Sequence, residues 1–263
     1  MPMAEVLLSA RDLSRRFGGL MAVSGVAIEL SRSCLHAVVG PNGAGKSTLI
    51  NLLSGDLRPS SGSIAYMNHD ITMLSPDRRS RLGIGRSYQK TNVFPLFTAF
   101  EKCRLAAQSR APKPWNWWKP AEAYQPACET ARHALEAARL AHRADCIAET
   151  LSHGEQRQLE LAMVLATAPQ VLLLAEPLAS MGTDEAARMV ELLQRLKPDH
   201  AILLIEHDMD AVFVVADVIT VMVNGQVLES GPPAVIRASA PVRQAYLGND
   251  EAVSTSSRDG AEP

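Results

Sequence analysis

Residues 40–48 read Gly-Pro-Asn-Gly-Ala-Gly-Lys-Ser-Thr, a glycine-rich run that ends in a lysine and two hydroxyl side chains. A short apolar run at 35–39 precedes it and another at 49–53 follows it, so the order is strand, loop and helix. Glycines let successive backbone N–H groups point inward around an anion, and the helix adds the positive end of its dipole. Lys46 would reach the β- and γ-phosphates, and the Ser47 hydroxyl would bind Mg²⁺. This segment predicts a binding site for a nucleoside triphosphate.

Three polar residues far from this loop also follow apolar strands. Gln89, Glu176 and His207 each come directly after a run of residues that is typical of a strand. Alternation of such runs with helical segments predicts an α/β fold with a mostly parallel sheet and helices on both faces. In such a sheet, ligands collect at the carboxyl ends of the strands. We therefore expect these three side chains and the loop at 40–48 to converge.

Composition limits the classes of function that remain. The 263 residues can bury a substantial core, and the apolar content of 47% is ordinary for a globular protein. A net charge of −2 without a long basic block argues against a nucleic-acid surface. No apolar run reaches the roughly 18–20 residues that span a bilayer, so any membrane role must come through a partner. The four cysteines lack metal-binding spacing and are expected to be reduced, small apolar residues in a cytosolic protein: Cys34, Cys103, Cys128 and Cys146.

The other elements follow from apolar periodicity and from turn residues. Strands are expected at 6–8, 23–30, 62–67, 84–88, 171–174 and 201–205, with a hairpin of 217–223 and 226–229 around an Asn-Gly turn. Helices are expected within 98–148, at 151–168, at 183–196 and around 235 and 242–247. The expected buried stripes are Ala127, Ala131, Leu135 and Ala138 in one helix, and Met189, Leu193 and Leu196 in another.

Three groups of side chains allow both a functional and a structural interpretation. Phe17 could stack on a purine or fill the core, and the residues alone leave both open. Arg78, Arg79 and Arg81 are interpreted as a solvated basic face of a short helix. All three tryptophans lie within 115–118, where they are expected to pack a surface hairpin, with a contact surface for a partner as the alternative.

Taken together, these motifs resemble those of the ATP-binding subunits of ABC transporters, over residues 5 to about 248. The matching parts are 40–48 with the Walker A loop, Gln89 with the Q-loop, 151–156 with the LSGGQ-type signature, 171–176 with the Walker B strand and its glutamate, and His207 with the switch histidine. Segments 17–20, 203–209 and 245–248 are most similar to the subgroup that serves high-affinity branched-chain amino acid uptake. Ser152-His153-Gly154 resembles members of that subgroup and of the related urea-uptake subunits.

The resemblance implies a P-loop NTPase (RecA-like) core with a mostly parallel sheet, an N-terminal antiparallel β subdomain and an inserted α-helical subdomain. The expected divisions are a single ATP-binding domain over 1–248, with a nucleotide-binding core at 1–89 and 151–230, a helical subdomain at 90–150, C-terminal helices at 231–248, and a disordered tail at 249–263. The helical subdomain would lie beside a groove that receives a cytoplasmic helix of a transmembrane subunit.

The resemblance also implies a role for each candidate residue, because phosphoryl transfer needs in-line positioning and neutralised charge. Glu176 would orient or deprotonate the attacking water, His207 would hold the γ-phosphate, and Gln89 would contact Mg²⁺ and report the nucleotide state to the membrane partner. With Lys46 these form the expected catalytic set, and Ser47 and Gln89 are the expected metal contacts. The expected nucleotide-binding residues are Phe17, Asn42, Gly43, Ala44, Gly45, Lys46, Ser47 and Thr48, with Ser152 and Gly154 capping the ATP of the opposing subunit.

Three positions depart from the family pattern. Ala175 stands where the Walker B aspartate is usual, Gly182 replaces the aspartate of the following loop, and Glu155 stands where glutamine is usual. A lost charge-assisted hydrogen bond costs about 1.5–3 kcal/mol, so Ala175 predicts weakened Mg²⁺ dependence. Either this site hydrolyses ATP slowly, or it binds ATP while a site in a partner turns over.

These features predict an ATP-hydrolysing subunit of an importer for branched-chain amino acids or a related small polar solute. It would be cytoplasmic and peripheral on the inner face of the cell membrane, paired with a second ATPase subunit as a heterodimer or homodimer. Two transmembrane permease subunits would hold it there, an extracytoplasmic solute-binding protein would act indirectly, and no nucleic-acid partner is expected. The alternatives are a subunit for lipid or lipopolysaccharide export, and a nucleotide-binding regulatory subunit with weak hydrolysis because of Ala175.

Overall fold

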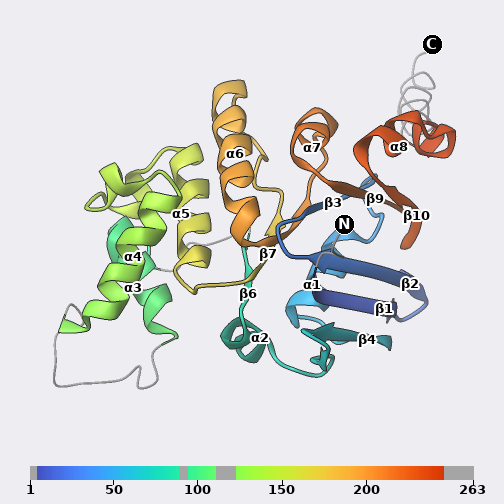
Figure 1. Ribbon diagram of the computed structural model, residues 1–263, viewed down its shortest axis with the longest axis horizontal. Coiled ribbons are helices and arrows are strands. Elements are labelled where there is room, and N and C mark those ends of the chain that lie inside the picture. Colours follow the sequence, from blue (N-terminus) through green and yellow to red (C-terminus); the bar gives the residue numbers. More distant parts are fainter. Residues whose placement is uncertain (1–4, 89–93, 111–122, 246–263) are drawn as a thin grey trace, which may run out of the picture.

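The computed structural model describes residues 5–88, 94–110 and 123–245, and it contains two sheets with helices around them (Figure 1). One sheet has four strands in the order β2-β1-β4-β5, and the other has six in the order β10-β9-β3-β8-β7-β6. The strands are β1 (Val6–Phe17), β2 (Leu20–Ser31), β3 (Leu35–Val39), β4 (Ser61–Tyr66), β5 (His69–Asp70), β6 (Ile84–Arg86), β7 (Val171–Ala175), β8 (Ala201–Ile205), β9 (Val218–Val223) and β10 (Gln226–Gly231). The α-helices are α1 (Lys46–Ser54), α2 (Pro76–Leu82), α3 (Ala99–Gln108), α4 (Gln125–Ala137), α5 (His153–Leu165), α6 (Thr183–Leu196), α7 (Met209–Val215) and α8 (Pro233–Ala238), and short 3₁₀ turns are η2 (Ala141–Arg143), η3 (Ala148–Thr150) and η4 (Lys197–Asp199). The predicted α/β class is confirmed, since one sheet is antiparallel and the other mostly parallel.

The antiparallel sheet is built on a long hairpin of β1 and β2, paired as far as Phe17 with Leu20. The sequence predicts strand only at 6–8 and 23–30. The polar segment after Leu13 lacks apolar alternation, but it is extended because its backbone pairs with β2. Cross-strand pairing therefore lengthens both strands beyond the part that burial alone predicts.

The centre of the six-stranded sheet consists of β3, β8 and β7, which pair in parallel in that order. Because helices cover both faces, β7 and β8 are continuous apolar runs rather than alternating ones, and β3 is apolar except for His36. The β9–β10 hairpin closes one end of the sheet. Its turn residues Asn224 and Gly225 have φ values of 49° and 79°, which fits the predicted type I′ turn.

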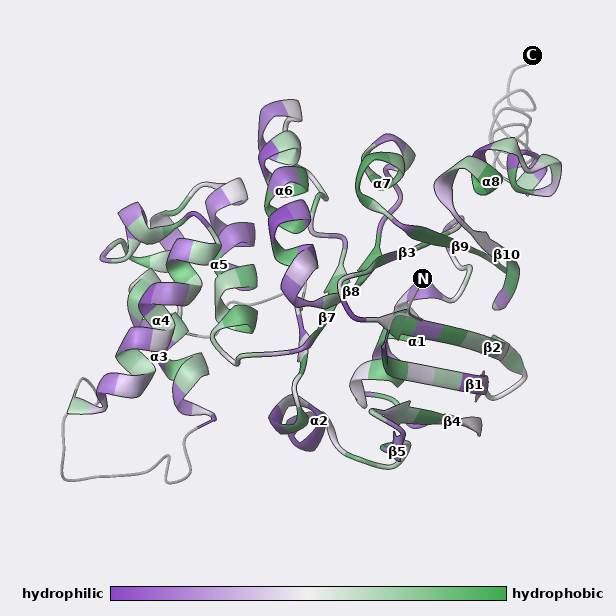
Figure 2. Cartoon of the chain, in the orientation of Figure 1, coloured by the Kyte–Doolittle hydropathy of each residue, from purple (hydrophilic) through white to green (hydrophobic). Residues whose placement is uncertain are grey.

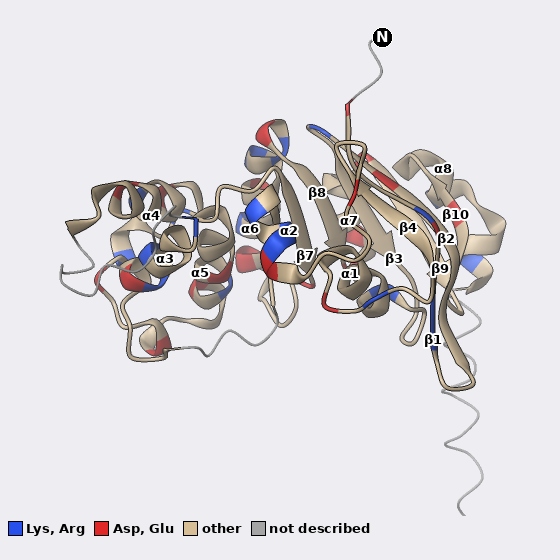
Figure 3. Ribbon diagram, turned by 90° about the horizontal axis from the view of Figure 1, so that it is seen from below, with Lys and Arg blue, Asp and Glu red and all other residues tan. Residues whose placement is uncertain are grey.

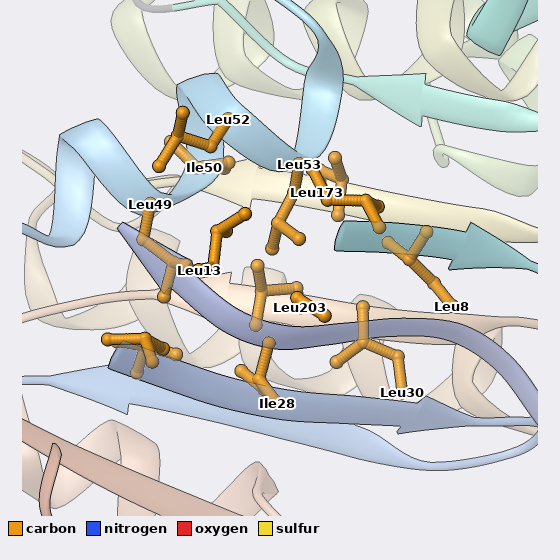
Figure 4. Packing of buried hydrophobic residues seen from close by; sticks show 14 of the residues in the cluster. Leu8, Leu13, Ile28, Leu30, Leu49, Ile50, Leu52, Leu53, Leu173 and Leu203 are labelled. Atoms are coloured by element: carbon orange, nitrogen blue, oxygen red, sulfur yellow. The ribbon is translucent and has the colours of Figure 1, made fainter. Parts of the chain in front are cut away.

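Helix α1 lies between the two sheets and shares one buried core with both (Figure 4). Leu49 and Leu53 of α1 belong to a cluster with Leu13 and Ile28 of the antiparallel sheet and Leu203 of the other sheet. Full burial of each such side chain is worth about 1.5–3 kcal/mol. The helix that begins at the glycine-rich loop is thus held from both sides.

Helices α6 and α7 cover the opposite face of the six-stranded sheet (Figure 1). Met189, Leu193 and Leu196 are buried against it, as predicted. Figure 2 shows hydrophobic residues concentrated in the strands, whereas α6 carries both hydrophilic and hydrophobic residues. This amphipathic pattern is what a helix needs to lie on a sheet with one side in water.

A third cluster at one end of the structure contains α3, α4 and α5 (Figure 1). The stripe predicted to be buried in α4 and just after it is buried: Ala127, Ala131, Leu135 and Ala138. Helix α5 spans His153–Leu165, less than the predicted 151–168, because the Ser152 side chain caps it. Its side chains enter both this cluster and the core over the sheet, so the division expected at residue 150 stays a prediction.

The prediction of a solvated basic face at Arg78, Arg79 and Arg81 is wrong for Arg79. Arg78 and Arg81 are exposed, but Arg79 is only 1% exposed. Its guanidinium donates to the carbonyls of Leu52 and Leu53, at 2.8 and 2.7 Å, and to two carbonyls of the chain before α2. Figure 3 shows acidic and basic residues together on α2, whereas the buried arginine satisfies the last turn of α1.

Two expectations from composition can be checked on the described residues. All four cysteines lie among them, and none forms a disulfide bond. Burial raises the pKa of the Cys103 thiol to about 12, so this side chain stays protonated and behaves as a small apolar residue. Among the described helices, none has both the length and the hydropathy that a bilayer span requires.

Candidate active site

The glycine-rich loop joins β3 to α1, so its surroundings are the start of a helix. Gly45 is the N-cap of α1 with φ 96°, and no side chain caps the helix. The first turn of α1 also contains no acidic residue. Its N–H groups and dipole therefore favour an anion, and this helix start fits a phosphate group.

Strands from distant parts of the sequence hold this loop. The Gly225 N–H in the β9–β10 turn donates to the Ala44 carbonyl at 3.0 Å, and the Ser24 N–H of β2 donates to the Gly225 carbonyl at 2.8 Å. A Cβ on Gly45 would collide with the Ala22 carbonyl of β2. Glycine is thus required at position 45 both for its φ value and for this close approach.

The Lys46 side chain lies folded within the loop. Its Nζ donates to the carbonyls of Gly40 and Pro41, at 2.5 and 3.0 Å. Burial lowers the pKa of the Lys46 amine, and the Glu176 carboxylate raises it in part. Glu176 is therefore close enough to Lys46 to interact with it electrostatically, as the predicted convergence requires.

Lys46, His207 and Glu176 follow neighbouring strands. Lys46 follows β3, His207 follows β8 and Glu176 follows β7, and these strands stand in the order β3-β8-β7. All three are parallel, so their carboxyl ends lie at the same edge of the sheet. The structure thus brings together three of the four groups expected to act on a triphosphate.

Glu176 has an unusual backbone conformation. Its φ is 49°, in the left-handed region that residues other than glycine rarely adopt. Its N–H donates to the Ile205 carbonyl at 2.8 Å, which ties it to the end of β8. Such conformations cost about 1–3 kcal/mol each and concentrate at functional sites, so this strain supports a functional role for Glu176.

Ala175 and Gly182, which stand where the family pattern has aspartates, provide no carboxylate near the carboxyl end of β7. Ala175 ends β7, and its N–H donates to the Ser87 hydroxyl at 3.2 Å. Gly182 is the N-cap of α6 and has no side chain to cap it, although Asp184 lies in the first turn. Within the described residues, no group of three or more His, Cys, Asp or Glu side chains could hold a metal ion.

The structure decides between the two interpretations of Phe17 only in part. Phe17 ends β1 and is 42% exposed, so it does not fill the core. The guanidinium carbon of Arg15 lies 4.7 Å from the centre of its ring, a cation–π contact. Stacking on a purine stays a prediction.

Ser152 and Gly154 lie at the start of α5, on a separate cavity of about 460 Å³. Arg143, Glu155 and Glu185 also line it, and none of its lining residues belongs to the loop at 40–48. The Ser152 and Gly154 positions therefore do not meet Lys46 within this chain, which is compatible with contact to a nucleotide on another subunit.

Glu155 organises this helix start. The Ser152 N–H donates to Glu155 Oε2 at 2.9 Å, and the Glu155 N–H donates to Ser152 Oγ at 3.3 Å, which forms a capping box. Arg143 Nε donates to Glu155 Oε1 at 2.7 Å, and this bond holds the pKa of the Glu155 carboxyl below its usual value. Glutamine could form the same box, but only glutamate adds the ion pair with Arg143.

Some predicted residues lie outside the part of the chain that the structure describes. Gln89 and the tryptophan segment 115–118 are among them, as is the tail after 248. Their predicted roles stay predictions.

Sequence reasoning assigned no role to Arg143 or Glu206, although both contact the candidate residues. Glu206 could have been noticed as a carboxylate at the end of the wholly apolar β8. Arg143 gave no comparable signal, because its partner Glu155 is in a different element.

The site geometry can be compared with known proteins. A model of the ABC transporter family matches residues 23–179, a span that includes the loop at 40–48, the start of α5 and Glu176. This chain belongs to the ABC transporter family. The match confirms the resemblance drawn from the motifs and the predicted enzyme class, an ABC-type ATPase.

Curated relatives of this ABC ATPase cover nearly its whole length. It is 35% identical over 253 residues to the high-affinity branched-chain amino acid transport ATP-binding protein BraF of Pseudomonas aeruginosa, which covers 94% of this chain and 99% of BraF. It is 36% identical over 254 residues to the protein of the same description, LivG, of Escherichia coli, with the same coverage. A probable branched-chain amino acid transport ATP-binding protein of Archaeoglobus fulgidus is 32% identical over 248 residues, with 92% of this chain and 95% of that protein covered.

Solved structures agree with the family assignment. A nucleotide-free ATP-binding cassette of an ABC transporter matches with a TM-score of 0.83 at 28% identity, over 92% of this chain and 98% of that one. An ATP-binding cassette in its ADP conformation matches with a TM-score of 0.82 at 28% identity, over 92% and 99%. The predicted P-loop NTPase core is thus confirmed.

Proposed function

We propose that this ABC ATPase hydrolyses ATP to power uptake of branched-chain amino acids, or of a related small polar solute, through separate transmembrane subunits. The observation that carries the proposal is the placement of Lys46, Glu176 and His207 at the ends of three adjacent parallel strands. The names of BraF and LivG support the solute class. They also favour import over the lipid-export alternative.

The reaction assigns one task to each side chain. The β- and γ-phosphates of ATP replace the Gly40 and Pro41 carbonyls as partners of Lys46, at the uncapped start of α1. Ser47 and Gln89 would hold Mg²⁺, which would supply charge neutralisation for phosphoryl transfer. Glu176 orients or deprotonates the attacking water, and His207 holds the γ-phosphate. Phe17 stacks on the base from the end of β1.

We place the second half of the site on another ATPase subunit. Ser152 and Gly154 lie away from the loop at 40–48, on a cavity of their own, so they are free to meet the ATP of an opposing subunit. ATP then joins two subunits, and hydrolysis releases them. The partner is a second ABC ATPase, identical or similar to this chain.

We also propose where a transmembrane subunit binds. A cleft of about 330 Å³ lies between α2, β6 and α5, lined by Asp77, Arg86, Glu160 and Met163 among others. It adjoins Ser87 and Tyr88, the described residues just before Gln89. A cytoplasmic helix of the permease in this cleft would sense Gln89 directly and hold the chain on the inner face of the membrane.

The test is an uptake assay of the complex reconstituted in vesicles with its permease subunits and binding protein. We expect ATP-dependent uptake of leucine, isoleucine or valine, and a loss of both uptake and ATPase activity in E176Q. Uptake of urea alone would place the chain in the related subgroup, and transport of lipid instead of amino acids would contradict the import proposal.

A regulatory role without hydrolysis is the second candidate, and Ala175 is the observation that favours it. The discriminating measurement is turnover of the assembled complex in which only the partner ATPase is inactivated. If hydrolysis remains in this complex and disappears in E176Q, catalysis belongs to this chain. If no hydrolysis remains, the role of this chain is regulatory.

A further inference from the structure

Glu206 is a buried carboxylate that the proposed reaction does not use. It follows β8 and precedes His207, and its side chain is 0% exposed. A buried carboxylate is costly unless hydrogen bonds satisfy its oxygens. Its partners therefore indicate what this residue does in the fold.

The two carboxylate oxygens accept hydrogen bonds from backbone N–H groups that follow two different strands, β7 and β8. Oε1 accepts from the Leu178 N–H at 2.8 Å, and Oε2 accepts from the His207 N–H at 3.2 Å. Leu178 lies two residues after Glu176 in the loop that follows β7, and His207 lies at the end of β8. A single side chain therefore connects the backbones that carry Glu176 and His207.

The loop after β7 depends on this connection. Leu178 is buried, so its N–H has no access to water and would lose its acceptor with Glu206. The Ala179 N–H donates to the Glu176 carbonyl at 3.2 Å, so the position of Leu178 is linked to that of Glu176 by a tight turn. Glu176 itself has the strained φ of 49°, which needs support from its surroundings.

His207 is placed differently from Glu206. Its side chain is 64% exposed, and its Nδ1 lies 3.8 Å from Glu206 Oε2. The imidazole is thus directed away from the core while the backbone beneath it is fixed by the buried carboxylate. This leaves the ring accessible to a phosphate without freeing its main chain.

We propose that Glu206 is a positioning residue that ties the Glu176 loop to His207, so that the water-activating and γ-phosphate-binding groups keep one geometry through the ATPase cycle. The inference rests on the proposed function for the roles of Glu176 and His207. Burial raises the pKa of the Glu206 carboxyl, whereas the N–H groups of Leu178 and His207 lower it in part, so these two hydrogen bonds favour the ionised form. Glu206 touches neither nucleotide nor water in this proposal.

The experiment compares E206Q with wild type in the reconstituted complex, with E101Q as the matched control. Glutamine keeps the size of the side chain but turns one acceptor into a donor that faces an N–H group. Glu101 also accepts from a backbone N–H, that of Thr98 in the capping box of α3, but it lies in the first turn of α3 and not next to β7 or β8. We measure ATP affinity, ATPase kcat, and hydrogen exchange of the peptide that covers 176–182.

For E206Q we expect kcat to fall about ten- to a hundredfold while the ATP Kd stays within about twofold, because small misplacements of reacting groups cost this much in rate. Exchange in 176–182 should accelerate, and exchange in α1 should not. E101Q should match wild type in all three measurements. If E206Q does not fold, E206D keeps the charge with a shorter reach and should show the same pattern.

The positioning role would be overturned if the kcat of E206Q stayed within twofold of wild type. It would also be overturned if E206Q lost kcat, ATP affinity and exchange protection in parallel throughout the chain. E176Q separates this failure from that of the proposed function. If E176Q abolishes hydrolysis and E206Q does not lower it, only the inference about Glu206 is wrong. If E176Q leaves hydrolysis intact, the assignment of Glu176 as the catalytic residue is itself wrong. Independently, unchanged hydrogen exchange of 176–182 in E206Q would show that Glu206 does not hold the Glu176 loop in place.

Discussion

Ala175 stands where the resemblance to the Walker B motif predicts an aspartate. Replacing Ala175 with aspartate adds a carboxylate next to Glu176, at the edge where we place Mg²⁺. One charge-assisted hydrogen bond to a metal-bound water is worth about 1.5–3 kcal/mol, so A175D should raise the ATPase rate of this site about ten- to a hundredfold. The rate is measured against Mg²⁺ concentration in the complex with an inactivated partner ATPase. Exposed A238D is the control for added charge, and an A175D rate equal to wild type would show that the missing aspartate is not limiting.

Arg79 governs stability rather than catalysis. R79M removes the donor for buried carbonyls at the end of α1, including those of Leu52 and Leu53. The Leu52 carbonyl keeps the Gly55 N–H, but the loss of the guanidinium from these buried carbonyls should lower the free energy of unfolding by about 2–4 kcal/mol. Urea denaturation of R79M against R78M, an exposed neighbour on the same helix, measures this difference. Equal midpoints for the two variants would contradict the buried role.

Sequence patterns correctly indicated which elements some candidate residues follow, whereas the roles of these residues stay predictions. Lys46 follows glycines, and Glu176 and His207 follow apolar strands, so local pattern was sufficient. Arg79 and Glu206 depend on acceptors or donors that are more than twenty residues away in sequence. Their burial is set by how separate elements pack, which no local pattern contains.

At the scale of elements, a buried histidine links strands of both sheets. His36 in β3 contacts the Glu29 carbonyl of β2 through Nδ1 at 3.1 Å and the Thr220 hydroxyl of β9 through Nε2 at 2.7 Å. Because a carbonyl only accepts, Nδ1 carries the proton and Nε2 accepts from Thr220. Burial lowers the pKa of His36 below its usual 6.5, so the folded imidazole stays neutral where the unfolded one binds a proton.

This histidine makes stability depend on pH. Its contribution is complete above pH 6.5 and decreases as the pH falls below that value, because the unfolded state then binds the extra proton. We expect the unfolding free energy of wild type to fall by up to about 1.4 kcal/mol per pH unit more steeply than that of H36Q. Urea denaturation from pH 7.5 to 5 measures both slopes. H133Q, on the surface of α4, is the control for loss of a histidine, and identical slopes for wild type and H36Q would exclude His36 as the cause.

Elements were predicted best where burial is one-sided or complete. The stripe of α6 and the runs of β7 and β8 were correct because each apolar residue faces the sheet or lies within it. The ends of β1 and β2 were missed because they are extended by pairing with each other and not by burial. Pairing between strands is a property of the hairpin, so neither strand shows it alone.

At the scale of the whole molecule, the separation of the two candidate half-sites gives a test of the dimer. E155A removes the acceptor of the Ser152 N–H and of Arg143 but lies away from the loop at 40–48. We expect ATP binding to the isolated chain to be unchanged. The ATPase activity of the assembled complex should fall at least tenfold, because the nucleotide of the opposing subunit would lose its contact with Ser152 and Gly154. E129A, exposed on α4, is the control. Weakened ATP binding by the isolated E155A chain would show that the two half-sites are not separate.

The hydrogen bond from the Gly225 N–H in the β9–β10 turn to the Ala44 carbonyl has a consequence for biosynthesis. The ribosome makes residues 40–48 early, but the neighbours of β3 in its sheet are β8 and β9, which emerge near the end of translation. Until then the nucleotide loop has β2 beside it but lacks β8, β9 and the Gly225 turn. We therefore expect ATP to stabilise the chain only after β8 and β9 have been synthesised and have paired with β3.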